Sequence, residues 1–397
     1  MNEKRKIAVV TGSRAEFGIL YYVIKELLAR KSVELQLIVT GSHLATSQGH
    51  TVDEIESHRF PIAGRIPMFL DGDNYEQIGC SVGLGVIGFS REFARLKPDI
   101  VLLLGDRYEI FAVATAAMSL NIPIAHIAGG ESDSSTCADG NIRNAITKLA
   151  HLHFVSTALY ADRIRHMGEE PWRIHTVGLP SLDNLRELVM PKNALANSLG
   201  LQFQKRIFLV TYNVVGLRIQ ESLAELDNML GALSSFTSDT TIVITLSNAD
   251  AAGREINKRL NAFASTRPNV HVCQSLGKQR YLSMLSVCDV VIGNSSSGII
   301  EAPSFAVGTV NIGARQDGRF FPPSVVSTTG ERADILRGIK TVLSDSFRKS
   351  IRTLVNPFGD GTSSRQIADV LERVELNAHF VEKKLVTPNT KESRDSK

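Results

Sequence analysis

The sequence has no long apolar run at its beginning. The opening stretch, MNEKRKIAVVTGSRAEFG, holds a short basic segment and an apolar run of five residues at most before Gly12 interrupts it. A signal peptide needs an apolar core of roughly 7–15 residues, and a membrane-spanning helix needs about 20. We therefore expect neither of these segments, and we expect a cytoplasmic protein.

Cysteine is also scarce, and neither sign of charge dominates. The four cysteines are scattered without a C-x-x-C pair, which is typical of reduced thiols rather than of a disulfide framework. The 44 basic and 41 acidic residues leave a net charge of +3, which is too balanced to indicate nucleic acid or an anionic membrane as a partner. With 43% hydrophobic and 21% charged residues, the 397-residue chain has an ordinary globular composition and is long enough for more than one domain.

Short, wholly apolar runs alternate with helical patterns along the chain. KIAVVTG precedes GILYYVIKELLAR, DIVLLLGDR precedes YEIFAVATAAMSL, and a second series starts at RIFLVTYN. Such alternation predicts parallel sheets covered by helices on both faces. We therefore expect an α/β protein with two Rossmann-like, doubly wound parallel-sheet domains and a cleft between them.

The domain boundaries follow from the same pattern. We place an N-terminal domain at 1–183, a C-terminal domain at 184–385 and a polar tail at 386–397. The C-terminal domain is expected to include a closing helix, because a Ser-x-x-Gln capping box at Ser363 or Ser364 precedes an apolar stripe.

Polar residues follow the predicted strands of the first domain, where open parallel sheets bind ligands. Glycine allows close backbone approach there, and arginine pairs with phosphate. One such strand end taken alone is ordinarily a βα turn with a helix N-cap, but several in one domain favour a ligand site. His43 remains open between a sugar contact and a structural turn. These strand-end residues are Gly12, Ser13, Arg14 and Glu16; Gly41, Ser42 and His43; Gly105, Asp106, Arg107 and Glu109; and Gly129, Gly130 and Glu131.

The second domain carries a sharper pattern, GNSSSGIIEAP. A predicted strand runs into Asn294, Ser295, Ser296 and Gly298, and a helix is expected to begin there with Glu301 one turn inside. Backbone amides and hydroxyls at such a turn form a phosphate seat, and a carboxylate one turn later can bind ribose hydroxyls. The alternative is a helix with redundant capping residues.

Taken together, these segments resemble the hydrolysing UDP-N-acetylglucosamine 2-epimerases of sialic-acid and legionaminic-acid pathways, which have the glycosyltransferase-B architecture. The likeness covers nearly the whole chain in order. It is carried by KIAVVTGSRAEFG, VTGSHL, GVIGFS, LLGDRYE, HIAGGE, IRNAITKLAHLHFVST, VGLPSLDNL, NADAAGREI, SLGKQRYLSMLSVCDVVIGNSSSGIIEAPSF and VNIGARQDGR.

The resemblance implies a reaction in two halves. UDP leaves C1 while a proton leaves C2, which gives a glycal, and water then adds at C1 as C2 is protonated from the other face. This chemistry needs a base and an acid on opposite faces of the sugar and cations for the departing diphosphate. The implied product is a free N-acetylmannosamine-type sugar, and the implied reaction needs no cofactor and no metal. The implied partner is a nucleotide sugar, UDP-linked by preference and GDP-linked as an alternative, and the protein is expected to be a homodimer or homotetramer.

The resemblance also assigns roles to residues. The expected catalytic carboxylates are Asp106, Glu131 and Asp139. Arg14, Ser295 and Ser296 are expected to hold the diphosphate, with Arg315 as a second cation, and Glu301 to hold the ribose. The remaining expected substrate or nucleotide contacts are His43, Arg107, Asn144, Asn213, Asn248, Asp250 and Gly298.

Several expected catalytic positions depart from the family pattern. Asn144 and Asn213 stand where the family usually has histidine, and Ala128 stands where it tends to have glutamate or histidine. Asparagine keeps a hydrogen-bonding shape but transfers no proton near neutral pH. One acid of an expected pair is also absent, because Gly140 follows Asp139. The nucleotide positions are kept, so the sequence supports nucleotide-sugar binding more strongly than epimerisation.

Three functions therefore stay open. The chain is a hydrolysing 2-epimerase in which Asp106, Glu131 and Asp139 share the proton transfers, or a related enzyme that eliminates or hydrolyses a nucleotide sugar without epimerisation, or a non-catalytic binding homologue. The carboxylates that remain favour an enzyme. A glycosyltransferase would use the same diphosphate site, but the sequence shows no feature that supplies an acceptor site.

Overall fold

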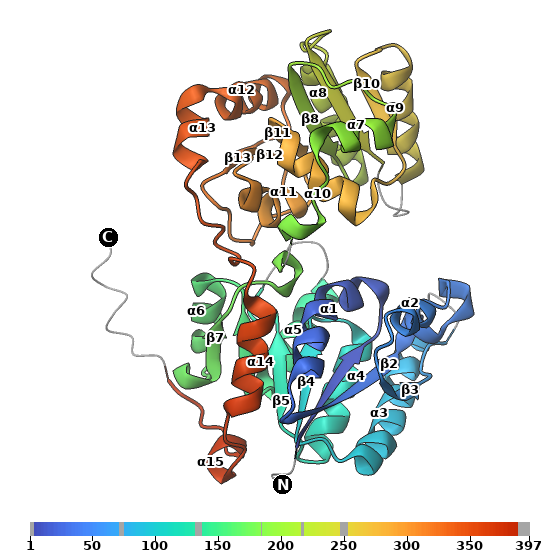
Figure 1. The fold of residues 1–397 in the computed structure, drawn as a ribbon, viewed down its shortest axis with the longest axis vertical. Coiled ribbons are helices and arrows are strands. Elements are labelled where there is room, and N and C mark those ends of the chain that lie inside the picture. Colours follow the sequence, from blue (N-terminus) through green and yellow to red (C-terminus); the bar gives the residue numbers. More distant parts are fainter. Residues whose placement is uncertain are drawn as a thin grey trace. The chain divides into compact units, whose positions relative to one another are not determined.

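The chain forms two compact units that contain the described residues 4–70, 75–131, 137–183, 185–215, 218–246 and 253–387 of the computed structural model (Figure 1). The first unit holds the described residues up to 183 together with 361–387, and the second unit holds those from 185 to 360. Each unit is an α/β domain built on its own sheet, as the alternating pattern predicts.

The first unit contains a seven-stranded parallel sheet in the order β3-β2-β1-β4-β5-β6-β7. The order reverses between β1 and β4, which is the switch point where doubly wound sheets bind ligands. The central strands are buried along nearly their whole length, as parallel strands covered on both faces must be. The strands are β1 (Arg5–Thr11), β2 (Val33–Thr40), β3 (Ile62–Ile66), β4 (Ile100–Leu104), β5 (Ile124–Ile127), β6 (Leu152–Val155) and β7 (Ile174–Thr176).

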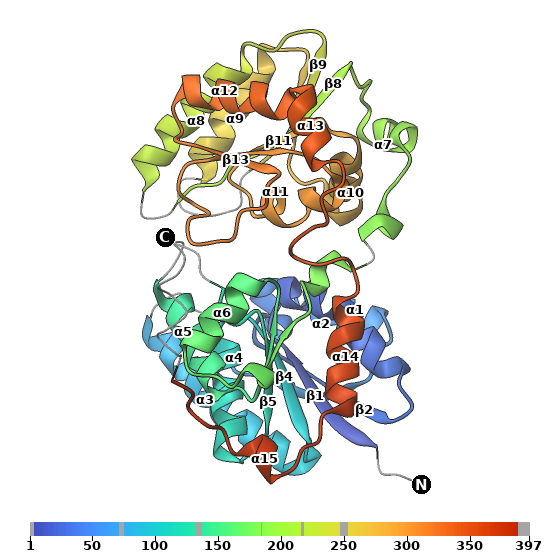
Figure 2. The same ribbon diagram turned by 90° about the vertical axis from the view of Figure 1, so that its left-hand side faces the viewer.

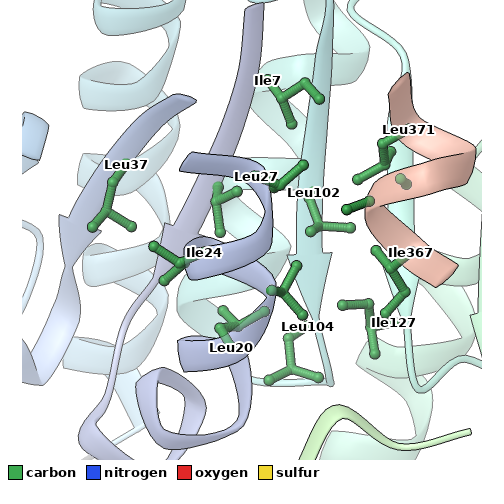
Figure 3. Close-up of a cluster of buried hydrophobic side chains, with 14 of the residues drawn as sticks. Ile7, Leu20, Ile24, Leu27, Leu37, Leu102, Leu104, Ile127, Ile367 and Leu371 are labelled. Carbon is green, nitrogen blue, oxygen red and sulfur yellow. The ribbon is translucent and has the colours of Figure 1, made fainter. Parts of the chain in front are cut away.

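Helices cover both faces of this sheet, and successive side chains of each strand point to opposite faces. Ile7 of β1 packs under α1 and α14 (Figure 3). The adjacent Ala8 packs under α3 and α4. The helices are α1 (Arg14–Ala29), α2 (Val52–Ser57), α3 (Tyr75–Leu96), α4 (Tyr108–Ser119), α5 (Cys137–Leu149), α6 (Ala158–His166), α14 (Ser363–Arg373) and α15 (Ala378–Val381).

Helix α14 packs against the first sheet, beside α1 (Figure 2). The guanidinium of Arg5 donates to the Leu371 and Glu372 carbonyls at 2.8 Å each, and Arg30 pairs with Asp369 at 2.6 Å. The expected grouping of this closing helix with the C-terminal domain is therefore wrong. Its apolar stripe identifies a helix that packs on a core, but it carries no information about which of two similar sheets supplies that core.

The N-terminus of α14 is also capped differently from the expected capping box. The carboxylate of Asp183 accepts hydrogen bonds from the amides of Ser363 at 3.1 Å and Ser364 at 2.6 Å. Asp183 is distant in sequence, so no local pattern could identify it as the cap.

The second unit contains a six-stranded parallel sheet in the order β10-β9-β8-β11-β12-β13, with its switch point between β8 and β11. Its strands are β8 (Arg206–Thr211), β9 (Thr240–Thr245), β10 (Val270–Cys273), β11 (Val290–Gly293), β12 (Thr309–Ile312) and β13 (Val325–Thr328). Its helices are α7 (Lys192–Leu199), α8 (Ile219–Leu233), α9 (Gly253–Ser265), α10 (Gly277–Val287), α11 (Ser297–Ile300), α12 (Arg332–Leu343) and α13 (Asp345–Ile351). Short 3-10 helices in the chain span Gly41–Leu44, Thr46–Gln48, Pro171–Arg173, Pro180–Leu182, Leu185–Leu188 and Ala302–Phe305.

Together the two sheets confirm the predicted fold class of two parallel-sheet α/β domains. Among the helices that the structure describes, none is both long and apolar enough to cross a membrane.

Candidate active site

Arg143 contacts the Asp106 carboxylate and the main chain of Glu131 at the carboxyl ends of β4 and β5. Its guanidinium forms an ion pair with Asp106, which follows β4, and donates to the Glu131 carbonyl oxygen, beyond β5, at 2.8 Å. The Glu131 carboxylate accepts a hydrogen bond from the Ser156 hydroxyl, beyond β6, at 3.3 Å. Three neighbouring strand ends therefore supply groups to one cluster. Arg143 was not singled out from the sequence, although it lies in the IR-x-A-ITK segment that carries the family resemblance.

Helix α5 carries the third expected carboxylate. Asp139 lies four residues before Arg143 and so on the same helix face, about 6 Å along the axis. The side chains of Asp139 and Asn144 are both exposed, whereas Arg143 between them is buried. Arg143 thus links the Asp106 carboxylate to the backbone of Glu131, and Asp139 lies one helical turn away from Arg143.

Two buried glutamates, Glu16 and Glu109, lie beneath the turns that follow β1, β2 and β4. Arg107 pairs with Glu109 at 2.8 Å, and the Gly12 amide donates to the Glu16 carboxylate at 2.7 Å. Burial, with a smaller contribution from the nearby Glu109 charge, raises the pKa of Glu16 to about 7. A side chain at Gly41 would place its Cβ 2.7 Å from the Gly12 carbonyl, so this turn needs glycine. Glu16 and Glu109 both follow predicted strands, but the sequence pattern assigns them no role.

Arg14 and His43 occupy the first two of these turns in different ways. The Arg14 side chain is 73% exposed and pairs with Glu54 of α2 at 2.9 Å. An exposed pair contributes about 1 kcal/mol at most, so a phosphate group can replace Glu54 at little cost. The imidazole of His43 is buried between the Thr11 hydroxyl at 3.0 Å and the Thr51 hydroxyl at 2.8 Å. Burial lowers the pKa of His43 to about 4, and its two occupied nitrogens favour the structural turn over a sugar contact.

Ala128 stands at the end of β5 in a left-handed backbone conformation, with φ at +67°. Its amide donates to the Phe154 carbonyl at 3.0 Å, which ties the turn to β6. A non-glycine residue in this conformation costs about 1–2 kcal/mol, so the strand end that leads to Glu131 is held under backbone strain.

In the second unit, Asn294 joins the ends of β8 and β11. Its side-chain amide donates to the Asn213 carbonyl at 2.8 Å, and its side-chain oxygen accepts from the Asn213 amide at 2.8 Å. The Asn294 carbonyl in turn accepts from Arg315 at 3.0 Å and from Gln316 at 2.8 Å. The loops that follow β8 and β12 are thereby hydrogen-bonded to one buried asparagine in the loop that follows β11. Sequence reasoning placed Asn294 at a strand end but did not identify this role.

The serine-rich turn after β11 leads into a helix that is shorter than expected. Helix α11 has four residues and continues as a 3-10 turn at Ala302–Phe305, so its dipole is smaller than that of a long helix. The Ser295 hydroxyl accepts from the Ser297 amide at 3.4 Å, and Ser296 precedes the first helical residue. A Cβ at Gly298 would lie 2.6 Å from the Thr309 methyl group, so packing on β12 accounts for that glycine.

Glu301, the expected ribose contact, ends α11. Burial raises the pKa of Glu301, and the nearby Ser297 hydroxyl and the charge of Lys278 on α10 partly offset that effect. A half-buried carboxylate near one lysine and beside a serine turn is suited to accept hydroxyl hydrogen bonds. Asn248 and Asp250, the other expected contacts in this unit, lie outside the described residues.

Two parallel-sheet units with polar groups at their strand ends define an α/β protein with a glycosyltransferase-B-like fold. The chain belongs to the UDP-N-acetylglucosamine 2-epimerase family, whose model matches residues 25–372. The resemblance seen in the sequence is thereby confirmed.

Two curated relatives and one solved structure illustrate this membership. The chain is 34% identical to the hydrolysing UDP-N,N'-diacetylbacillosamine 2-epimerase of Legionella pneumophila, over 96% of this chain and 98% of that protein. It is also 34% identical to the hydrolysing GDP/UDP-N,N'-diacetylbacillosamine 2-epimerase of Campylobacter jejuni, over 87% of this chain and 90% of that protein. The UDP-GlcNAc 2-epimerase of Neisseria meningitidis bound to UDP-GlcNAc superposes with a TM-score of 0.74 at 18% identity, over 92% of this chain and 99% of that chain, which supports the fold.

Proposed function

We propose that the chain is a hydrolysing 2-epimerase that acts on a UDP-linked N-acetylated amino sugar. The observation that carries the proposal is the cluster in which Arg143 pairs with Asp106 and binds the Glu131 carbonyl at 2.8 Å. Proton removal from C2 of a sugar requires carboxylates held in fixed positions, and one buried arginine holds both segments here. The names of the two 34% identical relatives make UDP-N,N'-diacetylbacillosamine the first candidate substrate, and the family description makes UDP-N-acetylglucosamine the second.

The proton transfers are assigned to the carboxylates that this chain retains. One carboxylate takes the C2 proton as the C1–O bond breaks and its electron pair leaves with UDP, which gives a glycal. Water then adds its hydroxyl at C1, and C2 receives a proton from the opposite face. Asp106, Glu131 and Asp139 share these steps, because Ala128, Asn144 and Asn213 hold no group that transfers a proton near neutral pH.

The nucleotide contacts are proposed from both units separately. In the first unit, Arg14 exchanges its exposed pairing with Glu54 for a phosphate oxygen. In the second unit, Ser295, Ser296 and Arg315 bind phosphate, and Glu301 binds ribose. Arg107 and Asn213 are proposed to shape these sites through the contacts with Glu109 and Asn294. We also propose that GDP-linked sugars are accepted less well than UDP-linked ones, and that the protein works as a homo-oligomer in the cytoplasm.

The first experiment follows each UDP-sugar by proton NMR with the purified protein in deuterium oxide. Release of UDP with deuterium at C2 of an epimerised free sugar supports the proposal. A vinyl proton that accumulates with UDP indicates elimination without hydration, and UDP with an unlabelled C2 indicates simple hydrolysis; either result overturns it.

A matched pair of variants ties the reaction to the cluster. Asp106→Asn removes a proton acceptor and keeps the shape, so turnover should fall by about 10²-fold or more while UDP binding persists. Asp162→Asn, on the surface of α6, changes an exposed carboxylate in the same way and should leave turnover unchanged. Equal activity of the two variants contradicts the assignment.

A further inference from the structure

His126 contacts the segments that precede Asp106 and follow Arg143, but it contacts neither residue directly. The residue is fully buried on β5. Its Nε2 lies 2.7 Å from the Gly105 carbonyl oxygen, and its Nδ1 lies 3.3 Å from the Thr147 hydroxyl. A carbonyl only accepts hydrogen bonds, so Nε2 carries the hydrogen and Nδ1 is the acceptor in the neutral ring. The Thr147 hydroxyl directs its hydrogen either to Nδ1 or to the Arg143 carbonyl 2.8 Å away.

The partners of His126 lie beside the expected catalytic groups. Gly105 directly precedes Asp106, and Thr147 lies one helical turn after Arg143 on α5. A Cβ at Gly129 would lie 2.9 Å from the Thr147 hydroxyl oxygen and 3.2 Å from His126 Nδ1, so the Gly-Gly-Glu turn packs directly on this pair. The three segments that carry Asp106, Arg143 and Glu131 therefore meet at one imidazole.

We propose that His126 is a positioning residue, whose neutral imidazole sets the spacing between the Asp106 turn and helix α5 and thereby keeps the Arg143–Asp106 pair in its productive geometry. The claim rests on the proposed function. His126 is no proton carrier here, because both nitrogens have partners inside the fold. Burial lowers the pKa of His126 to about 3, so the ring stays neutral over the working pH range.

Two substitutions test the roles of the two ring nitrogens of His126 separately. In His126→Gln, the side-chain amide reaches the former Nε2 position and keeps a donor toward Gly105. In His126→Asn, the shorter side chain reaches only the former Nδ1 position, so the Gly105 carbonyl loses its donor. A shift of about 1 Å in a catalytic group costs about 10²-fold in rate. We expect kcat of His126→Asn to fall by about 10²-fold and that of His126→Gln by about tenfold or less. KM and UDP binding stoichiometry should stay near wild type in both variants.

His153 offers a matched control. It is equally buried and pairs in register with His126 on the adjacent strand β6, but its Nε2 faces Glu169 at 3.3 Å instead of the cluster. His153→Asn and His153→Gln should lose stability comparably yet keep kcat. If the His126 and His153 variants lose kcat equally, or if His126→Asn retains full kcat, the positioning role is wrong.

A second readout is independent of turnover. Hydrogen exchange followed by mass spectrometry should show faster exchange in 105–107 and 137–149 for His126→Asn than for His153→Asn. If wild type releases no UDP from either sugar, the proposed function fails, and the hydrogen-exchange pattern alone then tests the positioning role. Identical hydrogen exchange in His126→Asn and His153→Asn overturns the positioning role.

Discussion

Glu16 should make the first unit less stable as the pH rises. Its carboxyl is buried with 6% exposure, and its pKa is raised from the ordinary 4.5 to about 7, mainly by burial. In the unfolded chain it ionises near pH 4.5, whereas in the folded unit it holds its proton until about pH 7. Its contribution to stability is therefore fully present below pH 4.5 and is lost as the pH rises through 7. At about 1.36 kcal/mol per pKa unit, the loss reaches about 3 kcal/mol.

Glu16→Gln should remove this dependence, because glutamine has the shape of the protonated acid and does not ionise. Urea unfolding between pH 5 and 8 measures the pH dependence of the unfolding free energy. Trp172, the single tryptophan, lies in the first unit, so its fluorescence reports the unfolding of that unit selectively. Relative to wild type, the variant should gain about 2.5 kcal/mol of unfolding free energy between the two ends of this range. Glu26→Gln, on the same helix, is the control. If wild type and Glu16→Gln show the same pH dependence, the burial argument is refuted.

Three further predictions concern other contacts. Gly293→Ala should destabilise the second unit by more than about 3 kcal/mol in urea unfolding, because the new Cβ would lie 1.9 Å from the Thr211 carbonyl oxygen. The control, Gly79→Ala, lies in an open helical position and should be neutral or stabilising. Asn294→Asp replaces the amide donor that faces the Asn213 carbonyl with a carboxylate oxygen. The UDP affinity measured by calorimetry should therefore fall at least tenfold. Unchanged affinity would contradict the proposed nucleotide site. Although burial opposes the shift, hydrogen bonds from His153, Lys148 and Lys383 lower the pKa of Glu169 to about 2. The ionised carboxylate therefore contributes about 3 kcal/mol of stability above pH 4.5, and this contribution is lost as the pH falls toward 2. Glu169→Gln should destabilise the protein at pH 7 and much less at pH 3, and an equal loss at both pH values would exclude this account.

The layout of strands and the location of the candidate site could be predicted from sequence. The apolar runs around Val9 and Leu102 indicate strands buried on both faces, and this local property identifies parallel sheets without any knowledge of partners. Parallel strands bring their carboxyl ends to one edge, so Asp106 and Glu131 could be expected together before any distance was known. Arg143 contacts the Asp106 carboxylate and the Glu131 backbone carbonyl at that edge.

Contacts between segments distant in sequence could not be predicted. The closing helix carries an apolar stripe that fits either sheet, and Arg5, Arg30 and Asp183 are the residues that hold it on the first one. Hydrophobic periodicity specifies that a helix needs a core, whereas the choice of core depends on shape and on polar partners elsewhere in the chain.

The sequence by itself therefore determined the family, the two α/β domains and the strand ends where chemistry is expected, because these depend on residue type and near-neighbour spacing. Only the tertiary structure decided that His126 contacts both Gly105 and Thr147, that Asn294 joins β8 to β11, and that Glu16 is buried beside Glu109. Those relations arise where backbone turns distant in sequence approach within hydrogen-bonding distance, and no local pattern of residues encodes that approach.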